Sequence, residues 1–600
     1  MVDGGTDWGH VDLEANVWIN TADTTINGID DDDNGYVDDV RGWNFVRDNG
    51  DPSGLTTAPV NASHGTEVAG VASAVTNNGI GIAGASWNAQ LMLVNVSCAS
   101  DTLICYGVEG IVYAAVNGAD IISLSWGSSH PDLSSFEERS LLKFWDDVSD
   151  FAAENGALLV AAAGNGNVLN DEALHTPASG RHILSVGATN KSSDVRAGFS
   201  NYGVTVDVFA PGTNLNSTLP DDAYTNESSG TSFSTPLVSG MAALVKTIFQ
   251  TYTPEQLAQK MRVTADNIDG VNSGLVGLMG KGRINAFRAV TDTSTPAIRI
   301  AGVSFIDSGG DGFIENGETV DVTVSLVNYL ADATDVAVTL TQADPNVTIT
   351  IGGATIAFLA SGDTAGVTFR FTLDQAGPGQ PLPFVVELTA GSYQDRDLFK
   401  LYANEPLIAI HDTGPIQVAL TSEGNIGWIG FAYESPGVGF IYKGTNLLFE
   451  GGLMVGISKN KVSDSVRGEG AARDQDFQMP PGGQLLLGPG QSANEEGAVV
   501  LIDDLASSPI GLLILQESFA DNNAAYDDFV IFRYVITNKS GGPLWNLYAG
   551  LFFDWDISEN GQTDYGRFDD ARRMGVVQNS GAAPTILAAT KLLTESGGLS

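Results

Sequence analysis

The sequence has few basic residues and no long apolar run. Lys and Arg together number 28 against 72 Asp and Glu in 600 residues, which gives a formal net charge of −44. Such a chain repels nucleic acid and anionic lipid. A run of about 18 apolar residues, which could cross a bilayer, does not occur. We therefore expect no nucleic-acid partner and no membrane span.

Cysteine is also scarce, because only Cys98 and Cys105 occur. Their spacing does not match a thiolate metal site. In a secreted chain it favours a disulfide that closes a small polar loop, and two free thiols are the alternative. The acidity fits an extracellular, calcium-rich or salty setting, or it serves solubility alone. We expect an extracellular location.

The chain is too long for a single hydrophobic core. Up to about residue 292, nearly continuous apolar runs alternate with helical patterns, which predicts a doubly wound, mainly parallel α/β sheet. Further on, apolar residues alternate with period two, as in 319–328, and helical patterns vanish. We predict an α/β domain with an incomplete first strand over 1–292, a β-sandwich over 298–404 and a second β-rich domain over 405–600. The predicted strands of the first domain include 91–96, 120–125, 157–163 and 182–187, and the predicted helices include 106–117, 134–155 and 282–290.

The stretch Gly230–Pro236 joins a loop to a helix of small and apolar residues. Ser232 at this junction has an exposed hydroxyl beside the unpaired N–H groups of the first helical turn. That arrangement suits a nucleophile whose oxyanion needs donors. The simpler interpretation is an ordinary helix cap.

Three further polar residues occupy similar junctions. His64 opens a small-residue helix, Asp3 ends a short strand before two glycines, and Asn165 follows the strand 157–163. Each has a structural alternative: a buried histidine, a turn aspartate and an Asn-Gly turn. Together they give the order Asp, His, Ser, which is the subtilisin order of a catalytic triad.

The surrounding residues resemble the motifs of the subtilisin-like serine peptidases, the subtilases. Residues 3–13 are similar to the family's aspartate motif, with Gly4 and Val11 as departures. Residues 64–70 are similar to its histidine motif, with Glu67 in place of a second histidine. Residues 230–236 are similar to its serine motif, with Phe233 and Ser234 as mild departures, and residues 161–165 match its oxyanion segment. The resemblance covers about residues 1–292.

This resemblance implies the roles of the site residues. Ser232 would be the nucleophile, His64 the general base and then acid, and Asp3 the group that orients His64. Asn165 and the backbone N–H of Ser232 would form the oxyanion hole. The substrate would add as a strand along an edge whose residues we expect to be Ser125, Trp126, Gly127 and Gly164. For Trp126, simple packing is the alternative.

Acidic loops predict structural calcium (Ca²⁺). In 30–39, carboxylates and amides alternate as in an EF-hand loop, although flanking helices are absent. The family resemblance implies a second site at Asp12 and Asn78, and the loop that enters the sandwich suggests a third. The candidate ligands are Asp30, Asp32, Asn34, Asp38, Asp12, Asn78, Asp307, Asp311 and Glu318. For the loop 30–39, a solvated acidic turn is the alternative.

The sequence therefore predicts a secreted serine endopeptidase that cleaves proteins or peptides through an acyl-enzyme. We expect a signal and a propeptide to lie outside this chain. The alternative is an inactive protease fold whose β domains serve calcium-stabilised adhesion or glycan binding, with a cell-surface or glycan partner.

Overall fold

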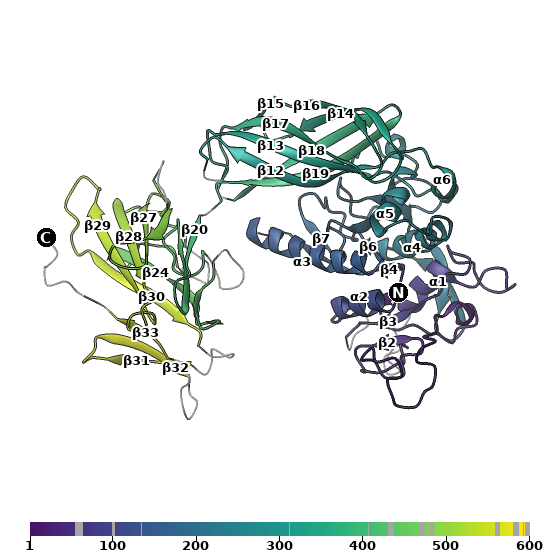
Figure 1. The fold of residues 1–600 in the computed structure, drawn as a ribbon, viewed down its shortest axis with the longest axis horizontal. Helices are drawn as coiled ribbons and strands as arrows, with labels where there is room; N and C mark the ends of the chain where they lie inside the picture. Colours follow the sequence, from purple (N-terminus) through teal and green to yellow (C-terminus); the bar gives the residue numbers. More distant parts are fainter. Residues whose placement is uncertain are drawn as a thin grey trace. The chain divides into compact units, whose positions relative to one another are not determined.

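A computed structural model gives the fold of the protein. It describes residues 1–53, 64–98, 103–131, 133, 135–310, 313–377, 379–405, 407–429, 437–466, 474–480, 485–557, 564–579, 587–591 and 593. The chain divides into two compact units, Met1–Asn404 and Glu405–Ser600 (Figure 1).

Two parallel sheets form the centre of the first unit. One has the strand order β1-β3-β2 and the other the order β4-β6-β8-β9. All five residues of β6 and all seven of β8 are buried, as expected for strands covered on both faces. The strands are β1 (Val2–Asp3), β2 (Gly42–Asn44), β3 (Leu93–Asn95), β4 (Ile121–Leu124), β6 (Leu158–Ala162), β8 (Ile183–Thr189) and β9 (Val208–Pro211).

In the described part of the first unit, six helices accompany these sheets. α4 contacts β4, β6, β8 and β9 as well as α1, and its Val238, Ala242 and Val245 are buried against the second sheet. The helices are α1 (His64–Ser73), α2 (Gly107–Val116), α3 (Ser135–Glu154), α4 (Thr231–Ile248), α5 (Pro254–Val263) and α6 (Ala286–Thr291), with short 3-10 turns at Glu14–Asn16 and Asp269–Val271. This arrangement confirms the predicted α/β fold. Two small antiparallel pairs lie beside it: β5 (Ser128–His130) with β7 (Leu174–Thr176), and β10 (Leu215–Leu219) with β11 (Ala223–Ser228).

One predicted helix begins later than expected. The pattern predicts a helix over 282–290, but α6 starts at Ala286, because Asn285 caps it by accepting from the Arg288 N–H. Arg283 and Ile284 instead pair their backbones with Asp266 and Phe209.

Residues 298–403 form two antiparallel sheets that share one apolar core. Burial alternates strictly along β13, which confirms the period-two pattern. One sheet has the order β12 (Ile298–Asp307), β13 (Thr319–Asn328), β17 (Thr364–Leu373) and β15 (Val347–Ile351). The other has the order β16 (Gly353–Leu359), β14 (Ala333–Thr341), β18 (Gln380–Ala390) and β19 (Tyr393–Ala403).

A buried ion network joins this sandwich to the α/β region. Arg262 on α5 is 2% exposed and lies 2.8 Å from Asp207 and 3.3 Å from Asp395 on β19. Lys281 also approaches Asp395, at 3.6 Å. Separating a buried guanidinium from its carboxylates costs free energy, because it leaves an unpaired buried charge. This network therefore favours a fixed junction inside the first unit.

Within its described ranges, the second unit consists of antiparallel strands in four sheets. Their strands are β20 (Ile408–His411), β21 (Ile416–Thr421), β22 (Phe440–Tyr442) and β23 (Thr445–Asn446); β24 (Leu448–Ser458), β25 (Lys461–Asp464) and β30 (Tyr548–Trp555); β26 (Leu485–Pro489), β27 (Glu495–Ile502), β28 (Leu512–Ala520) and β29 (Val530–Asn538); and β31 (Asp564–Asp569), β32 (Met574–Asn579) and β33 (Leu587–Lys591). The β-rich character predicted for this region is confirmed.

Candidate active site and acidic loops

Several chain segments of the first unit meet around one cavity of about 470 Å³. β1 ends with Asp3, α1 begins with His64, and Ser232 lies in the first turn of α4. All eight residues that the sequence predicts as catalytic or substrate-binding line this cavity. Its lining consists of Asp3, His64, Glu67, Ile104, Ser125, Trp126, Gly127, Ala162, Gly164, Asn165, His175, Thr231 and Ser232.

Asp3 and His64 are in direct contact. The Nδ1 atom of His64 lies 2.6 Å from Oδ1 of Asp3, which also accepts the N–H of Gly4 at 2.7 Å. The Asp3 side chain is 4% exposed and that of His64 is 35% exposed. Gly65 permits this approach, because a Cβ there would lie only 2.3 Å from the carbonyl oxygen of Gly4. The small residue after the histidine therefore lets α1 lie against the end of β1.

This contact sets the basicity of His64. Burial alone would lower the pKa of the imidazole, because it disfavours the charged form. The charge of Asp3 and its hydrogen bond, with a contribution from the charge of Glu67, outweigh burial and raise the pKa of His64 above its usual 6.5. An ionised carboxylate only accepts, so Nδ1 carries a proton and Nε2 is left as the basic atom.

Ser232 shares the cavity with His64 but bonds to a different neighbour. Its hydroxyl donates to the carbonyl of Ser125 at 2.9 Å, and the Ser125 hydroxyl donates to the carbonyl of Ser232 at 2.8 Å. This reciprocal pair fixes the start of α4 against the end of β4. Transfer of a proton to His64 requires the Ser232 hydroxyl to turn, and such contacts commonly tighten only when substrate is bound.

Asn165 is oriented by the same helix start. Its Oδ1 accepts the backbone N–H of Thr231 at 2.8 Å and the Thr231 hydroxyl at 3.0 Å. Because a backbone N–H only donates, the oxygen of Asn165 must face Thr231, and the amide NH₂ is left to donate to another group. Asn165 is exposed at the cavity, so this donor is accessible to a ligand.

A second cavity of about 300 Å³ adjoins the first, and Ile104, Trp126 and Gly127 line both. Its walls include Val108 and Trp145. Trp126 thus forms part of the wall of both cavities, which together are called the groove.

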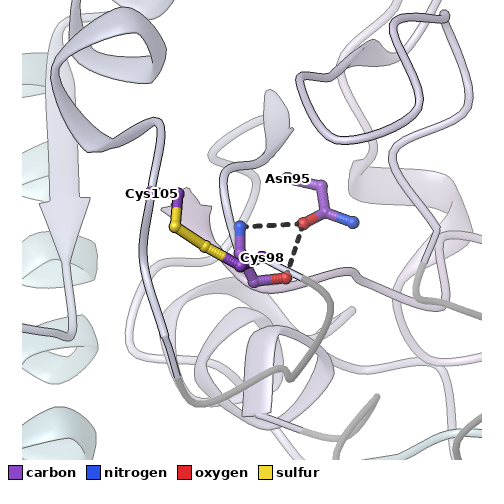
Figure 2. Close-up of a disulfide and its surroundings, with 4 residues drawn as sticks. Asn95, Cys98 and Cys105 are labelled. Atoms are coloured by element: carbon purple, nitrogen blue, oxygen red, sulfur yellow. Dashed lines mark hydrogen bonds between the residues drawn. A yellow bond between two sulfur atoms is a disulfide. The ribbon is translucent and has the colours of Figure 1, made fainter. Parts of the chain in front are cut away.

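A disulfide fixes one wall of the second cavity. Cys98 and Cys105 are joined, with their Cα atoms 5.6 Å apart, so the favoured pairing forms. Figure 2 shows the bond beside Asn95, whose Oδ1 accepts the backbone N–H of Ser97 at 3.2 Å and its hydroxyl at 3.0 Å. Cys105 itself lines the second cavity. The disulfide therefore holds the chain that follows β3 beside the second cavity.

Five lining residues were not predicted as site residues, namely Glu67, Ile104, Ala162, His175 and Thr231. Glu67 accepts the Ser228 hydroxyl at 2.6 Å, and Ile104 lies within the loop that the Cys98–Cys105 disulfide closes. His175 lies in β7, with its Nδ1 atom 2.9 Å from the Ser129 hydroxyl. Burial, with a contribution from His130, lowers the pKa of His175 to about 4, so it is neutral near pH 7. The scarcity of histidine was the one available signal for His175, because β7 reaches the cavity only through tertiary packing.

The acidic loop contains a carboxylate cluster with a member that the sequence did not indicate. Asp23, Asp30 and Asp32 each offer an oxygen, and these atoms lie within 4.8 Å of one another. Asp23 is fully buried, and neither of its oxygens has a hydrogen-bond partner among the described residues. Burial and the charges of Asp39 and Asp31 raise the pKa of Asp23, and the nearby backbone N–H groups of Asp39 and Asp38 oppose this rise without forming a hydrogen bond of ordinary geometry. Two orphaned oxygens facing two further carboxylates fit an oxygen-preferring cation.

The other predicted residues of this loop have different contacts. The side-chain amide of Asn34 donates to Asp32 at 3.2 Å and to Asp39 at 3.1 Å. Asp38 accepts the backbone N–H groups of Asn27 at 2.8 Å and Gly28 at 2.9 Å. Asp39, which is buried, also accepts the hydroxyl of Tyr113 on α2 at 2.6 Å. The loop is thereby tied to a helix of the core.

The remaining predicted ligands are more fully partnered. Asp12 is buried and accepts from the amide of Asn78 at 2.6 Å and from the Ile82 N–H at 2.8 Å. In the sandwich, a Cβ at Gly309 would lie 2.4 Å from Oε1 of Glu318 and 3.2 Å from Oδ2 of Asp307, so both carboxylates adjoin this glycine. Asp311 lies outside the described residues.

Comparison with known proteins identifies the family. Residues 1–282 match the family model Peptidase_S8, described as the subtilase family. The chain is 36% identical over 252 residues to "Thermitase" of Thermoactinomyces vulgaris, covering 42% of this chain and 81% of that protein. This chain belongs to the subtilase family. It is also 33% identical over 293 residues to "Thermophilic serine proteinase" of Bacillus sp. (strain AK1), covering 48% of this chain and 61% of the relative.

A solved structure gives a further comparison for this subtilase. "Proteases from Pseudoalteromonas arctica PAMC 21717" is 26% identical, with a TM-score of 0.36, and the match covers 48% of this chain and 87% of that one. The family model and thermitase confirm the recognition of a subtilase from its three motifs, and the strand order confirms the α/β fold followed by β-rich regions. The subtilases are serine-type endopeptidases, which is the enzyme class that the motifs predict.

Proposed function

We propose that this subtilase is an active endopeptidase that cleaves proteins and peptides through an acyl-enzyme on Ser232. The observation that carries the proposal is the 2.6 Å contact between Asp3 and His64 at a cavity that Ser232 also lines. Three residues from distant parts of the chain converge there, in the chemical combination that acyl transfer needs.

The geometry supports a definite role for each group. With a proton on Nδ1 shared with Asp3, Nε2 of His64 accepts the Ser232 proton as its oxygen attacks the scissile carbonyl. His64 then returns that proton to the leaving amine. Water repeats the sequence to release the acid and regenerate Ser232. The free NH₂ of Asn165 and the backbone N–H of Ser232 donate to the oxyanion. Loss of one such donor costs about 100- to 1000-fold in turnover, a magnitude established on subtilisin itself.

An assay with a protein substrate tests this proposal. Wild type and His64→Ala are incubated with casein, and the products are sequenced by mass spectrometry. We expect internal cleavages with the wild type and almost none with the variant, since His64 is the only base that the proposal uses. The alternative, an inactive fold with adhesive β domains, predicts no cleavage by either protein.

We further propose that Ca²⁺ stabilises the acidic loop, with Asp23, Asp30 and Asp32 as ligands. The support is the buried, unpartnered carboxylate of Asp23 beside two others, because like charges this close repel unless a cation lies among them. The ion would hold the segment that precedes β2, and β2 pairs with β3 next to β1. The sites at Asp12 with Asn78 and at Asp307 with Glu318 remain predictions.

Calcium titration by calorimetry and thermal melting tests the ion site without an activity assay. We expect calcium to raise the melting temperature of the wild type and EDTA to reverse the rise. Asp23→Asn should lose most of this shift, whereas Asp33→Asn, an exposed change in the same loop, should retain it. Coincident melts of the wild type with calcium and with EDTA would refute the proposal.

We also propose that the protein acts outside the cell. The Cys98–Cys105 disulfide supports this location, because disulfides persist in oxidising compartments. Within the described residues, the helices are all too short or too polar to cross a membrane. Fractionation of the native host with an antibody to the first unit would locate it, and recovery in the cytosol would contradict the proposal.

A further inference from the structure

The carbonyl of Val2 has an unusual hydrogen-bond donor. In the parallel pairing of β1 with β3, the ladder uses the carbonyls of Met1 and Asp3, which accept from Val94 and Val96 at 2.9 Å each. Because successive carbonyls of a strand point to opposite sides, the carbonyl of Val2 faces away from β3. The indole N–H of Trp126 donates to it at 2.8 Å.

This bond connects two sheets that share no backbone ladder. β1 is the edge strand of the sheet β1-β3-β2, and β4 is the edge strand of the sheet β4-β6-β8-β9. Trp126 lies two residues beyond the end of β4. Its side chain therefore supplies to Val2, which is fully buried, the donor that a neighbouring strand would otherwise provide.

The same indole lies in the wall of the substrate groove. Trp126 lines both cavities, and its ring packs so closely on α2 that a Cβ at Gly107 would lie 2.6 Å from it. The ring of Trp145 is 6.3 Å away. The side chain is thus held between the groove and the peptide group that leads directly into Asp3.

We propose that Trp126 is a positioning residue that couples the substrate groove to Asp3. The proposal rests on the proposed peptidase function, in which Asp3 orients His64. The Val2 carbonyl belongs to the peptide group that immediately precedes Asp3, so the bond from Trp126 acts on the direction of the Asp3 side chain. A peptide bound in the groove contacts Trp126, whose indole N–H holds the Val2 carbonyl. Binding of the peptide therefore steadies the contact between Asp3 and His64.

The test replaces the indole by groups that fill space without donating. Trp126→Phe and Trp126→Met remove the N–H and keep apolar bulk. Trp43→Phe is the matched control. Trp43 is buried in β2, which belongs to the same sheet as β1, and it lies outside the lining of both cavities. For each full-length protein, kcat and KM are measured with one peptide, and the titration of His64 is followed by NMR with labelled histidine, assigned with His64→Ala.

The expected result is a lower kcat together with a lower pKa of His64 in both Trp126 variants. Loss of the donor leaves a buried carbonyl unpaired and lets the peptide group before Asp3 shift. We expect the resulting misplacement of Asp3 and His64 to lower kcat by about tenfold. The pKa of His64 should move toward 6.5 because Asp3 is held less firmly. Trp43→Phe should leave both quantities unchanged.

A wild-type kcat and a wild-type titration of His64 in the Trp126 variants would overturn the proposal, even if KM rose, because a mere wall of the groove affects binding alone. An equal shift in Trp43→Phe would also overturn it, since the effect would then be a general loosening of the sheet. If the wild type cleaves no substrate, the proposed function fails, and the His64 titration still decides the role of Trp126.

Discussion

Ser232 and Asp3 stand at opposite ends of the proposed triad, and the protein holds them in different ways. Ser232 lies in the first turn of an 18-residue helix whose apolar side is buried in the core. Asp3 ends strand β1 and is held by individual contacts, from the Gly4 N–H to its carboxylate and from the Trp126 indole to the carbonyl of Val2. The proposed orienting carboxylate thus depends on single neighbouring groups, whereas Ser232 depends on the packing of a whole helix.

Among the substitutions near Asp3, Asp3→Asn has the largest expected effect. The amide keeps the shape of the carboxylate but offers Nδ1 no charge and can hold the wrong tautomer of His64. We expect kcat to fall by about 10⁴-fold with little change in KM. The pKa of His64 should fall at the same time, because the charge and hydrogen bond that raise it are lost. Unchanged turnover of a casein-derived peptide would exclude Asp3 from the mechanism.

Two glycines, one beside Asp3 and one beside Ser232, allow a direct comparison of how the two residues are held. A Cβ at Gly65 would lie 2.3 Å from the Gly4 carbonyl oxygen, so Gly65→Ala must push α1 and His64 away from the end of β1. We expect a fall in kcat of about 100-fold, the effect of a misplacement near 1 Å. At Gly230 the nearest heavy atom to an added Cβ is 3.6 Å away, and the obstacle is a φ of 150°.

Gly230→Ala should therefore act on stability more than on rate, at about 1–3 kcal/mol of backbone strain. Melting temperature and kcat measured on both variants give the comparison. A larger loss of kcat in Gly230→Ala than in Gly65→Ala would show that the Ser232 side is the more sensitive one, contrary to what we expect.

The pH profile gives the smallest of the expected effects. His64 must be neutral to accept a proton, and its pKa lies above 6.5. The rate should therefore rise with pH, and kcat/KM at pH 5.5 should be at least about tenfold below its plateau. Asp3→Asn should move this acidic limb to lower pH, because its His64 is the weaker base. If the acidic limb of the profile stays at the same pH in this variant, Asp3 does not control the pKa of the group that titrates.

The sequence predicted the residues that occupy recognisable junctions. Asp3, His64, Asn165 and Ser232 each stand where a strand ends or a helix begins, next to small residues, and such positions are visible in a local stretch of chain. The apolar runs likewise indicated the buried strands of the α/β region, because burial on both faces leaves few polar positions.

Other residues depend on packing between distant segments. His175 reaches the cavity through the pairing of β7 with β5, and Trp126 meets Val2 where two separate sheets adjoin. Asp23 precedes the EF-hand-like pattern by seven positions, and its burial arises from the path of the loop. α6 starts later than the pattern predicts for a similar reason, because the backbones of Arg283 and Ile284 pair with Asp266 and Phe209.

Covalent labelling with a fluorophosphonate probe tests the activation of Ser232 most directly, because it reports a reactive serine without any assumption about the substrate. Native wild-type protein is treated with the probe and the modified residue is located by mass spectrometry, with Ser232→Ala and Ser229→Ala, an exposed neighbour, as matched variants. We expect one adduct on Ser232, retained in Ser229→Ala and lost in Ser232→Ala and in His64→Ala. Folded wild-type protein that carries no adduct on Ser232 would contradict the proposed triad.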